Sequence, residues 1–149
     1  MQLLLSLEEQ IAAMKATWPG LAPRKIDRRL QSSRWVGRVR AQYCWYTIEI
    51  RYRVGSMPEV RVLAPTLVRL PDNEEGALPH VYPPADDPTL CLFDPRTGEW
   101  DASMPLAQTI IPWTLDWLSC YELWLMTGKW TGGGRHVCDP VPISMENLQ

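Results

Sequence analysis

Apolar residues near the N-terminus recur at the spacing of a helix. Four of them fall on one stripe: Leu7, Ile11, Met14 and Trp18. Ser6 and Glu9 have the spacing of a capping box, in which each side chain bonds the backbone N–H of the other residue. The pattern predicts a helix over residues 7–17, and Pro19 with Gly20 should end it.

From Arg34 onward the period changes to two, which is typical of half-buried strands. One face of the first run is apolar or small: Trp35, Gly37, Val39 and Ala41. The second run, from Cys44 to Tyr52, also places its apolar residues on one face, and residues 59–63 supply a third strand after the turn VGSMP. We expect an antiparallel meander in which Cys44 is a small buried hydrophobe.

Residues 64–105 break both periods and hold eight of the 14 prolines. A segment of this length without regular structure in a compact domain is usually functional or disordered. Interleaved apolar residues need somewhere to pack, which argues against disorder. We therefore predict an ordered proline-rich loop, pinned against the sheet, with Cys91 near its middle.

After Pro105 the helical period returns. One set of residues steps at three, four or seven: Leu106, Ile110, Trp113, Trp117, Cys120 and Trp124. Pro112 should split or kink this region, giving a short helix and then a longer one that ends near Thr127 and Gly128. Cys120 is expected in the core.

The composition fits a single domain over residues 1–149. Hydrophobic residues make up 46% and charged residues 21%, so neither a disordered nor a membrane-spanning chain is indicated. With the order of elements, this composition predicts one α+β domain. The chain has 8 tryptophans and 1 phenylalanine, so tryptophan should contribute much of the packing in the core. The N-terminus lacks the features of a secretory signal, and a cytoplasmic location is expected.

The four cysteines are not arranged in a CxxC pair: Cys44, Cys91, Cys120 and Cys138. In a reducing compartment we expect them to be thiols rather than disulfides. Only His80 and His136 could join them as ligands, so no zinc site is expected. The sequence has no phosphate-binding loop either, and no cofactor is expected.

The net charge of −2 argues against a dedicated nucleic-acid binder. The charge is unevenly distributed, since residues 1–70 hold 12 Lys and Arg against 5 Asp and Glu, whereas residues 71–149 hold 3 against 12. The simpler explanation of this asymmetry is that the charged side chains form ordinary solvated surface. The other explanation is that the basic half guides a docking partner.

The stretch LPHVYPPADDPTLCLFDPRTGEW, residues 78–100, places Cys91 in the proline-rich loop. A working cysteine needs partial exposure and a donor-rich or electropositive setting, because the thiolate is the nucleophile, and a prolyl loop exposes it. A thioester carries an acyl group to an amine without a metal or organic cofactor. His80 is either a hydrogen-bond donor to the oxyanion or a structural loop residue.

The same stretch resembles the ubiquitin-conjugating enzyme family, and more closely its bacterial branch associated with type II CBASS antiphage operons. PHVYPPADDPTLCLFDPRTGEW is similar to the family's His-Pro-Asn-(Val/Ile)-Tyr-Pro…(Ile/Leu)-Cys-Leu…Trp passage, and MPLAQTIIPWTLDWLSCYELWL to the helix after it. LPHVY, IIPW and TGKWTGGGRH resemble the bacterial branch further. The resemblance covers most of the chain.

The resemblance implies a ubiquitin-conjugating-enzyme-like fold, with an N-terminal helix, an antiparallel β-meander, a proline-rich active-site loop, a long C-terminal helix and a truncated C-terminus. It implies that Cys91 is the catalytic residue of an acyl transferase in antiviral defence. Cys91 would form a thioester with the C-terminus of a ubiquitin-like protein, or of the operon's cGAS-like nucleotidyltransferase, and pass it to an amine. An activating enzyme is a further possible partner, whereas nucleic acid and membranes are not expected.

The resemblance also draws attention to TGGGRHV, because in the family the loop after the long helix folds back beside the active cysteine. On that path the three glycines bring His136 within reach of the Cys91 thiol or of the attacking amine. A C-terminal tail that only covers the sheet is the alternative.

Three departures separate the chain from the family's pattern. Pro79 and His80 stand where the family has Pro-Asn, so His80 is the residue placed to replace that asparagine beside the oxyanion. The chain ends soon after the long helix, and no activating-enzyme domain is fused to it.

Two other functions stay open on the sequence. A catalytically inert adaptor of the same fold would bind its partner through the basic half, with Cys91 vestigial. A cysteine hydrolase would need a histidine oriented beside the thiol, and His80 with Asp94 are the candidates for that role.

Overall fold

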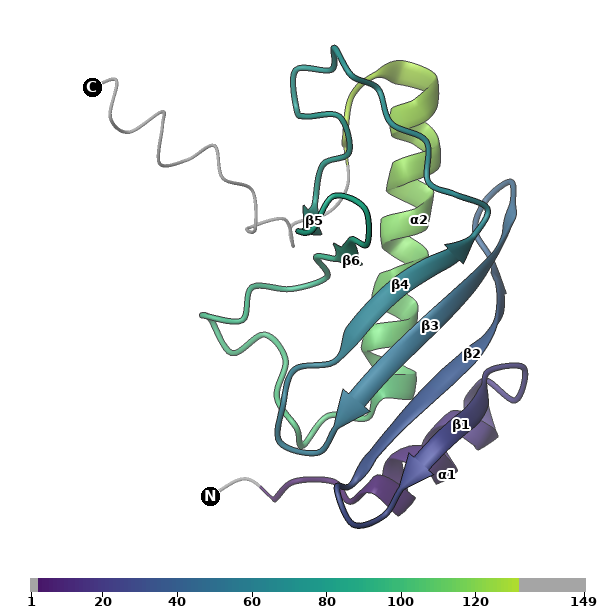
Figure 1. Cartoon of the computed structure of the whole chain (residues 1–149), viewed down its shortest axis with the longest axis vertical. Coiled ribbons are helices and arrows are strands. Elements are labelled where there is room, and N and C mark those ends of the chain that lie inside the picture. Colours follow the sequence, from purple (N-terminus) through teal and green to yellow (C-terminus); the bar gives the residue numbers. More distant parts are fainter. Residues whose placement is uncertain (1–2, 132–149) are drawn as a thin grey trace.

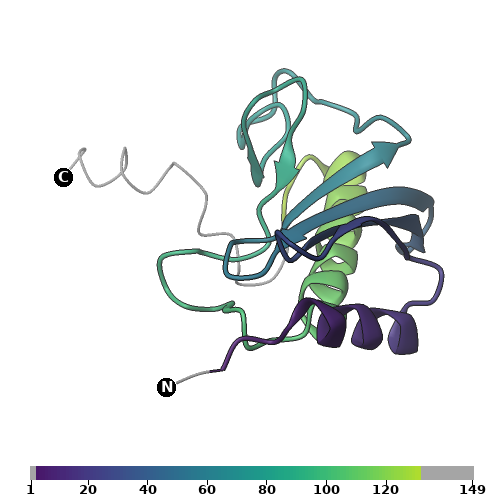
Figure 2. The same ribbon diagram turned by 60° about the horizontal axis from the view of Figure 1, so that its bottom comes forward.

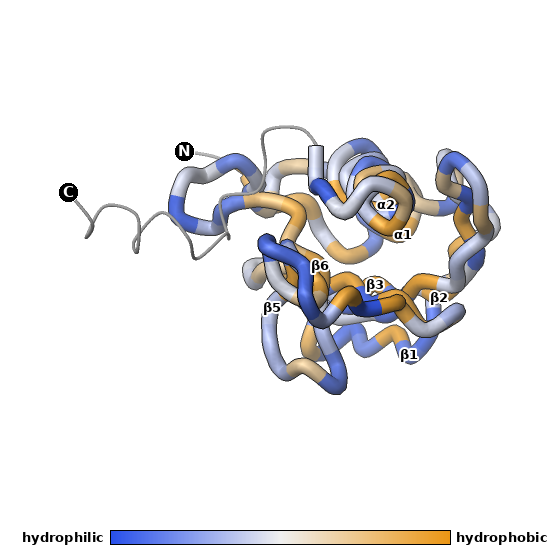
Figure 3. The backbone as a smooth tube through the Cα atoms, turned by 90° about the horizontal axis from the view of Figure 1, so that it is seen from above, coloured by the Kyte–Doolittle hydropathy of each residue, from blue (hydrophilic) through white to orange (hydrophobic). Residues whose placement is uncertain are grey.

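The computed structural model describes residues 3–131 of the chain. Its elements in chain order are α1 Leu7–Thr17, β1 Ala22–Asp27, β2 Ser32–Arg40, β3 Trp45–Arg53, β4 Glu59–Ala64, β5 Val81–Tyr82, β6 Thr89–Leu90, η1 Leu106–Gln108 and α2 Ile110–Thr127. β1 to β4 form an antiparallel sheet in sequence order, and β5 pairs with β6 in a separate two-stranded sheet. Figure 1 looks onto the larger sheet with α2 behind it, and Figures 2 and 3 show both helices on the same side of that sheet. The predicted α+β architecture, with a helix before and a helix after the meander, is confirmed.

The first helix has the predicted bounds. Ser6 Oγ accepts from the backbone N–H of Glu9, and Glu9 Oε1 accepts from that of Ser6, so the capping box is complete. The stripe predicted from the period faces inward, with Leu7 and Met14 fully buried. Gln10 is fully buried as well, and its amide accepts from the N–H of Leu106 and donates to the carbonyl of Met104. The helix is therefore tied to the segment that leads into α2.

The three strands expected from the period of two are confirmed, but the hydrophobic pattern does not predict β1. Its sequence APRKID places a proline and charged residues where alternation would be needed, and none of its residues is fully buried. β1 is an edge strand that pairs only with β2, and Pro23 is tolerated there because an edge strand leaves some N–H groups unpaired.

The apolar face of β3 points inward, but Cys44 does not share it. Four side chains of that face are buried: Tyr46, Ile48, Ile50 and Tyr52. Cys44 is exposed in the turn before β3, so its assignment as a buried hydrophobe is wrong. The backbone N–H groups of Tyr43 and Cys44 donate to the carboxylate of Glu122 on α2, so the N–H at each of these two residues bonds a helix side chain and not a neighbouring strand.

Pro112 does not split the second helix as expected. A short 3₁₀ turn, η1, precedes α2, and Pro112 is the third residue of an uninterrupted helix. A proline in the first turn needs no intrahelical partner for its missing N–H, so it breaks no hydrogen bond there. The predicted end is confirmed, because Gly128 adopts the left-handed conformation that follows the last helical residue, Thr127.

The proline-rich segment between β4 and η1 contains two short strands, β5 and β6, where none was expected. The segment contacts α2, since the N–H of Val68 donates to the Tyr121 hydroxyl and the indole N–H of Trp117 donates to the carbonyl of His80. It also contacts β4 through an ion pair of 3.0 Å between Arg61 and Asp87. Neither helix within residues 3–131 is both long and apolar enough to cross a bilayer.

Gly37 on β2 leaves no room for a side chain. A Cβ at this position would lie 2.2 Å from the carbonyl oxygen of Gly20 and 2.9 Å from Cδ2 of Leu21. We predict that Gly37→Ala lowers the free energy of unfolding by about 1–3 kcal/mol, because the backbone after α1 must move. Urea denaturation followed by circular dichroism measures the change.

Gly20→Ala is the matched control for this prediction, because a Cβ there meets nothing within 4 Å. Its free energy of unfolding should change by no more than about 0.5 kcal/mol. A Gly37→Ala variant as stable as the wild type would show that the contact with Gly20 does not constrain the fold.

Candidate active site

Cys91 directly follows β6 and lies opposite His80 at the open end of a small hairpin. The strands pair Val81 with Leu90 and Tyr82 with Thr89. The pairing continues by one step, since the N–H of Cys91 donates to the carbonyl of His80 over 3.0 Å. Backbone hydrogen bonds thus bring two predicted site residues, Cys91 and His80, side by side.

Cys91 is buried, so the expectation that a prolyl loop exposes it is wrong. Cys91 is 3% exposed, and its neighbours along the chain, Leu90, Leu92 and Phe93, belong to the hydrophobic core. The apolar residues around the cysteine in the sequence are themselves core residues, and they carry Cys91 inward with them.

Cys91 is also disulfide-bonded in the structure, whereas neither Cys44 nor Cys120 is in a disulfide. The expectation that all four cysteines are thiols is therefore wrong at this position. Sequence spacing alone does not reveal which cysteines pair. A sulfur in a disulfide is not a nucleophile, so any acyl chemistry at Cys91 requires its prior reduction.

Tyr82 places a hydroxyl beside the sulfur of Cys91. The hydroxyl oxygen lies 3.6 Å from Sγ, and because a disulfide sulfur has no hydrogen, the tyrosine is the donor. Burial, and then the negative charge of Asp94, raise the pKa of Tyr82, so the hydroxyl keeps its proton at neutral pH. Sequence reasoning did not select Tyr82. The strand-forming pairs VY and TL lie on either side of the Pro-Pro turn, and this pattern indicates the hairpin that brings Tyr82 close to Cys91.

Asp94, three residues after Cys91, forms an ion pair with Arg96. Its carboxylate accepts from the backbone N–H of Arg96 at 2.9 Å and from the guanidinium at 3.0 and 3.3 Å. These hydrogen bonds, the side-chain ones first, lower the pKa of Asp94 and keep it ionised. No hydrogen bond joins Asp94 to His80 among the described residues, so the arrangement expected of a hydrolase has no support from this contact.

His80 contributes to the site through its backbone. Its φ of 58° lies in the left-handed region, which is uncommon for a residue with a Cβ. Its carbonyl accepts two hydrogen bonds, from the N–H of Cys91 at 3.0 Å and from Nε1 of Trp117 at 2.9 Å. The imidazole lies 4.8 Å from the ring of Trp130, so aromatic packing holds its side chain.

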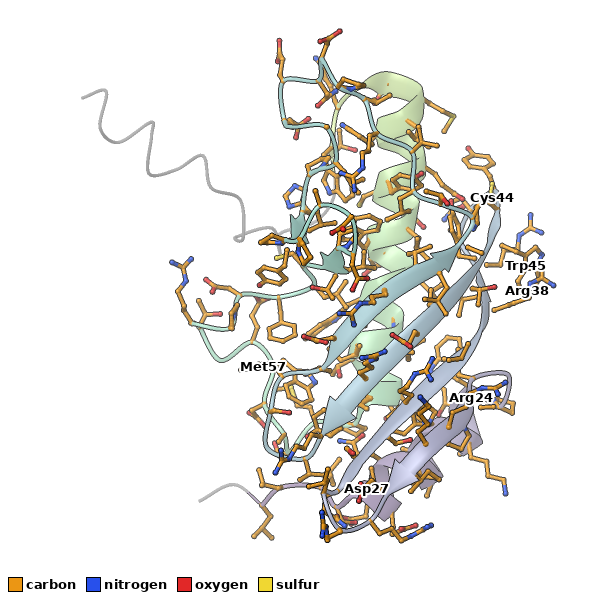
Figure 4. The ribbon with its side chains drawn as sticks, in the orientation of Figure 1. Arg24, Asp27, Arg38, Cys44, Trp45 and Met57 are labelled. Carbon is orange, nitrogen blue, oxygen red and sulfur yellow. The ribbon has the colours of Figure 1, made fainter. Side chains whose placement is uncertain are left out.

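A cleft of about 270 Å³ opens next to the Cys91 segment. It lies between the β3–β4 turn, which contributes Met57 and Pro58, and the residues around the cysteine, which contribute Tyr82, Leu92 and Phe93. Figure 4 shows Met57 at that turn. The cleft is mainly apolar and is able to receive an extended segment of a partner close to Cys91.

The remaining predicted site residue, His136, lies outside the described residues, as do the three glycines that precede it and Cys138. Within residues 3–131, no three His, Cys, Asp or Glu side chains stand together as metal ligands would.

The chain was compared with known proteins and families. No curated protein matches it. Residues 10–137 match the family described as Type II CBASS E2 protein. The match includes the sheet, the hairpin with His80 and Cys91, and α2. It spans most of the 149 residues, and the chain therefore belongs to the Type II CBASS E2 protein family.

Proposed function

We propose that this E2-like protein of a CBASS system carries an acyl group on Cys91 as a thioester. The observation that supports this most directly is the Tyr82 hydroxyl 3.6 Å from Sγ of Cys91, in a hairpin whose backbone bonds fix both residues. A donor in this position stabilises the thiolate first and the oxyanion of a tetrahedral intermediate later. The family membership supports the E2-like role.

A thiol reductant first opens the disulfide of Cys91 by thiol–disulfide exchange, is itself oxidised to a disulfide, and releases Cys91 as a thiolate. The acyl transfer then takes place in two steps. The thiolate attacks the carbonyl carbon of an activated C-terminal carboxyl, an acyl adenylate or a thioester on an activating enzyme, and expels AMP or the enzyme's thiol. An acceptor amine then attacks the thioester carbonyl, forms an amide and expels Cys91 as a thiolate, while the amine proton passes to a base. The apolar cleft beside Tyr82 and Leu92 is suited to hold the chain that bears the carboxyl.

The acyl donor is the C-terminus of the operon's cGAS-like nucleotidyltransferase or of a ubiquitin-like protein, and an activating enzyme would supply it in activated form. His80 has a positioning role in this proposal, because its carbonyl holds the N–H of Cys91. His136 is proposed as the base that accepts the amine proton, on the sequence argument alone.

A catalytically inert adaptor is the second candidate, and the burial of Cys91 favours it. Cys91 is 3% exposed and disulfide-bonded, so it can stabilise the fold without taking part in any acyl transfer. The two candidates differ in one observable property, which is whether the reduced protein forms a thiol-labile adduct.

Cys91 should be the one cysteine whose loss abolishes the adduct. We expect the protein, purified with its operon partners and analysed on denaturing gels without reductant, to carry a band shift that dithiothreitol removes. Cys91→Ala should lose this band, and Cys91→Ser should convert it into an oxyester that survives dithiothreitol but not alkali.

Cys44→Ala and Cys120→Ala are the matched controls, since neither cysteine is in a disulfide and both lie outside the hairpin. Both variants should keep the band. A thiol-labile band in Cys91→Ala would contradict the assignment, and no band in the fully reduced wild type would favour the adaptor.

The hydroxyl of Tyr82 should lower the pKa of the reduced Cys91 thiol. Tyr82→Phe keeps the ring and removes only the donor, so the pH at which iodoacetamide alkylation reaches half its maximal rate should rise. Acyl transfer should slow about 10- to 100-fold, somewhat less than the loss measured for dedicated oxyanion donors. Because the raised pKa of Tyr82 keeps its proton on throughout about pH 6 to 9, the loss should follow the titration of the thiol: it should be largest below the thiol pKa and smaller above it.

Tyr43→Phe is the control for this prediction, because Tyr43 is exposed in the β2–β3 turn and lies outside the hairpin. His80→Ala keeps the carbonyl that holds Cys91 and removes only the imidazole, so slower transfer to the amine with unchanged loading of Cys91 in this variant would assign the side chain a role of its own. An unchanged alkylation profile in Tyr82→Phe would remove Tyr82 from the mechanism.

A further inference from the structure

Three arginines lie side by side across the outward face of the larger sheet. The register pairs Arg24 with Arg34 and Arg34 with Arg51, so their side chains share one row on three adjacent strands. Like charges that are directly opposite in a sheet are destabilising. Such a row is tolerated where carboxylates of the same chain neutralise it or where its charge serves a function.

Carboxylates of the same chain neutralise the charge of these arginines only in part. Glu49 is 3% exposed and accepts from Arg34 at 2.6 Å and Arg51 at 3.1 Å, with Arg61 at 3.8 Å. One carboxylate thus serves three guanidinium groups, although Arg61 also pairs with Glu59 and Asp87.

The whole outward face has an excess of positive charge, and we call it the arginine face. Its basic strand residues are Arg24, Arg34, Arg38, Arg40, Arg51, Arg53 and Arg61. Its acidic strand residues are Asp27, Glu49 and Glu59, so seven charges oppose three and leave an excess of four. Within residues 3–131, Arg24, Arg38, Arg40 and Arg53 make no ion pair.

A hollow of about 500 Å³ lies at one end of the arginine face. Four basic residues line it: Lys25, Arg34, Arg51 and Arg53. Lys25 sits at the irregularity of β1, where a φ of 49° interrupts the pairing with β2. The hydroxyl group of Ser32 stands at the same hollow, so its rim offers a further hydrogen-bond donor to a carboxylate.

The other end of the face carries an exposed tryptophan. Trp45 is 49% exposed, and the guanidinium of Arg38 lies 4.8 Å from its ring centroid. Figure 4 shows these two side chains together at the far end of β2 and β3 from Asp27. The buried carboxylate of Glu122 fixes the turn before Trp45 by accepting from Tyr43, Cys44 and Tyr46, so the indole is held in place while exposed.

We propose that the arginine face binds an acidic polypeptide segment of a partner protein, with carboxylates on the arginine row and an apolar side chain on Trp45. Arg51 and Trp45 are six residues apart on β3, which is roughly 20 Å, so about six to eight extended residues reach from one to the other. Arginine and tryptophan are the residue types that contribute most to binding at protein interfaces. A polypeptide supplies both groups that the face accommodates, carboxylates for the arginine row and an apolar side chain for the exposed indole of Trp45.

Fluorescence anisotropy with a labelled peptide tests the proposal. The probe is an eight-residue peptide of Asp and Glu with one Leu near the end, of about the length that spans the face. We expect the double variant Arg24→Glu/Arg53→Glu to weaken the peptide about tenfold or more, and Trp45→Ala to weaken it several-fold. Binding should persist in Cys91→Ala, because the proposal does not rest on acyl transfer.

The matched control is Arg29→Glu/Lys129→Glu, which makes the same change in net charge outside the sheet. Both residues are exposed, one in the β1–β2 turn and one after α2. An equal loss in this control would overturn the proposal, since it would show an effect of net charge alone. Tighter binding of an eight-nucleotide single-stranded DNA than of the peptide would overturn it in favour of nucleic acid. Salt-sensitive self-association that Arg24→Glu/Arg53→Glu abolishes, seen by sedimentation, would overturn it in favour of a second copy of the chain.

Discussion

The backbone of the proline-rich segment depends on hydrogen bonds from the side chains of α2. A buried N–H or C=O without a partner costs about 1–3 kcal/mol, and a chain that forms few ladders must find partners elsewhere. Trp117 donates to the carbonyl of His80, and Tyr121 accepts from the N–H of Val68. Tyrosine and tryptophan suit this task because each has a large apolar body and one polar end. The position of Cys91 follows, since its N–H bonds the same His80 carbonyl.

The elements that could be predicted from the sequence are those that bury one face and expose the other. α1, β2 and β3 show the periods of 3.6 and 2 because their inward residues meet a common core. β1 buries little and has no such period, so no rule of alternation finds it. The prediction that Pro112 splits the helix was wrong for a related reason. The effect of a proline depends on its position relative to the start of the helix, and the sequence does not define that start to within one turn.

The candidate site was located from the sequence, but its environment was not. Cys91 is recognisable from the motif around it, and its contact with His80 follows from the hairpin. The burial of Cys91 and its disulfide depend on residues that are distant in the sequence, and so does the hydroxyl of Tyr82 beside the sulfur. A protected sulfur and a reactive one are two redox forms of the same residue. The reducing power of the compartment thus determines which form the protein has.

Gln10 shows how a polar group in the core can determine the orientation of a helix. Its amide both accepts from Leu106 and donates to Met104, so a shift of α1 by a single residue would leave two buried backbone groups without partners. The amide therefore contributes to stability and to alignment together, because a leucine at this position would leave the Leu106 N–H and the Met104 carbonyl without this partner even in the native alignment.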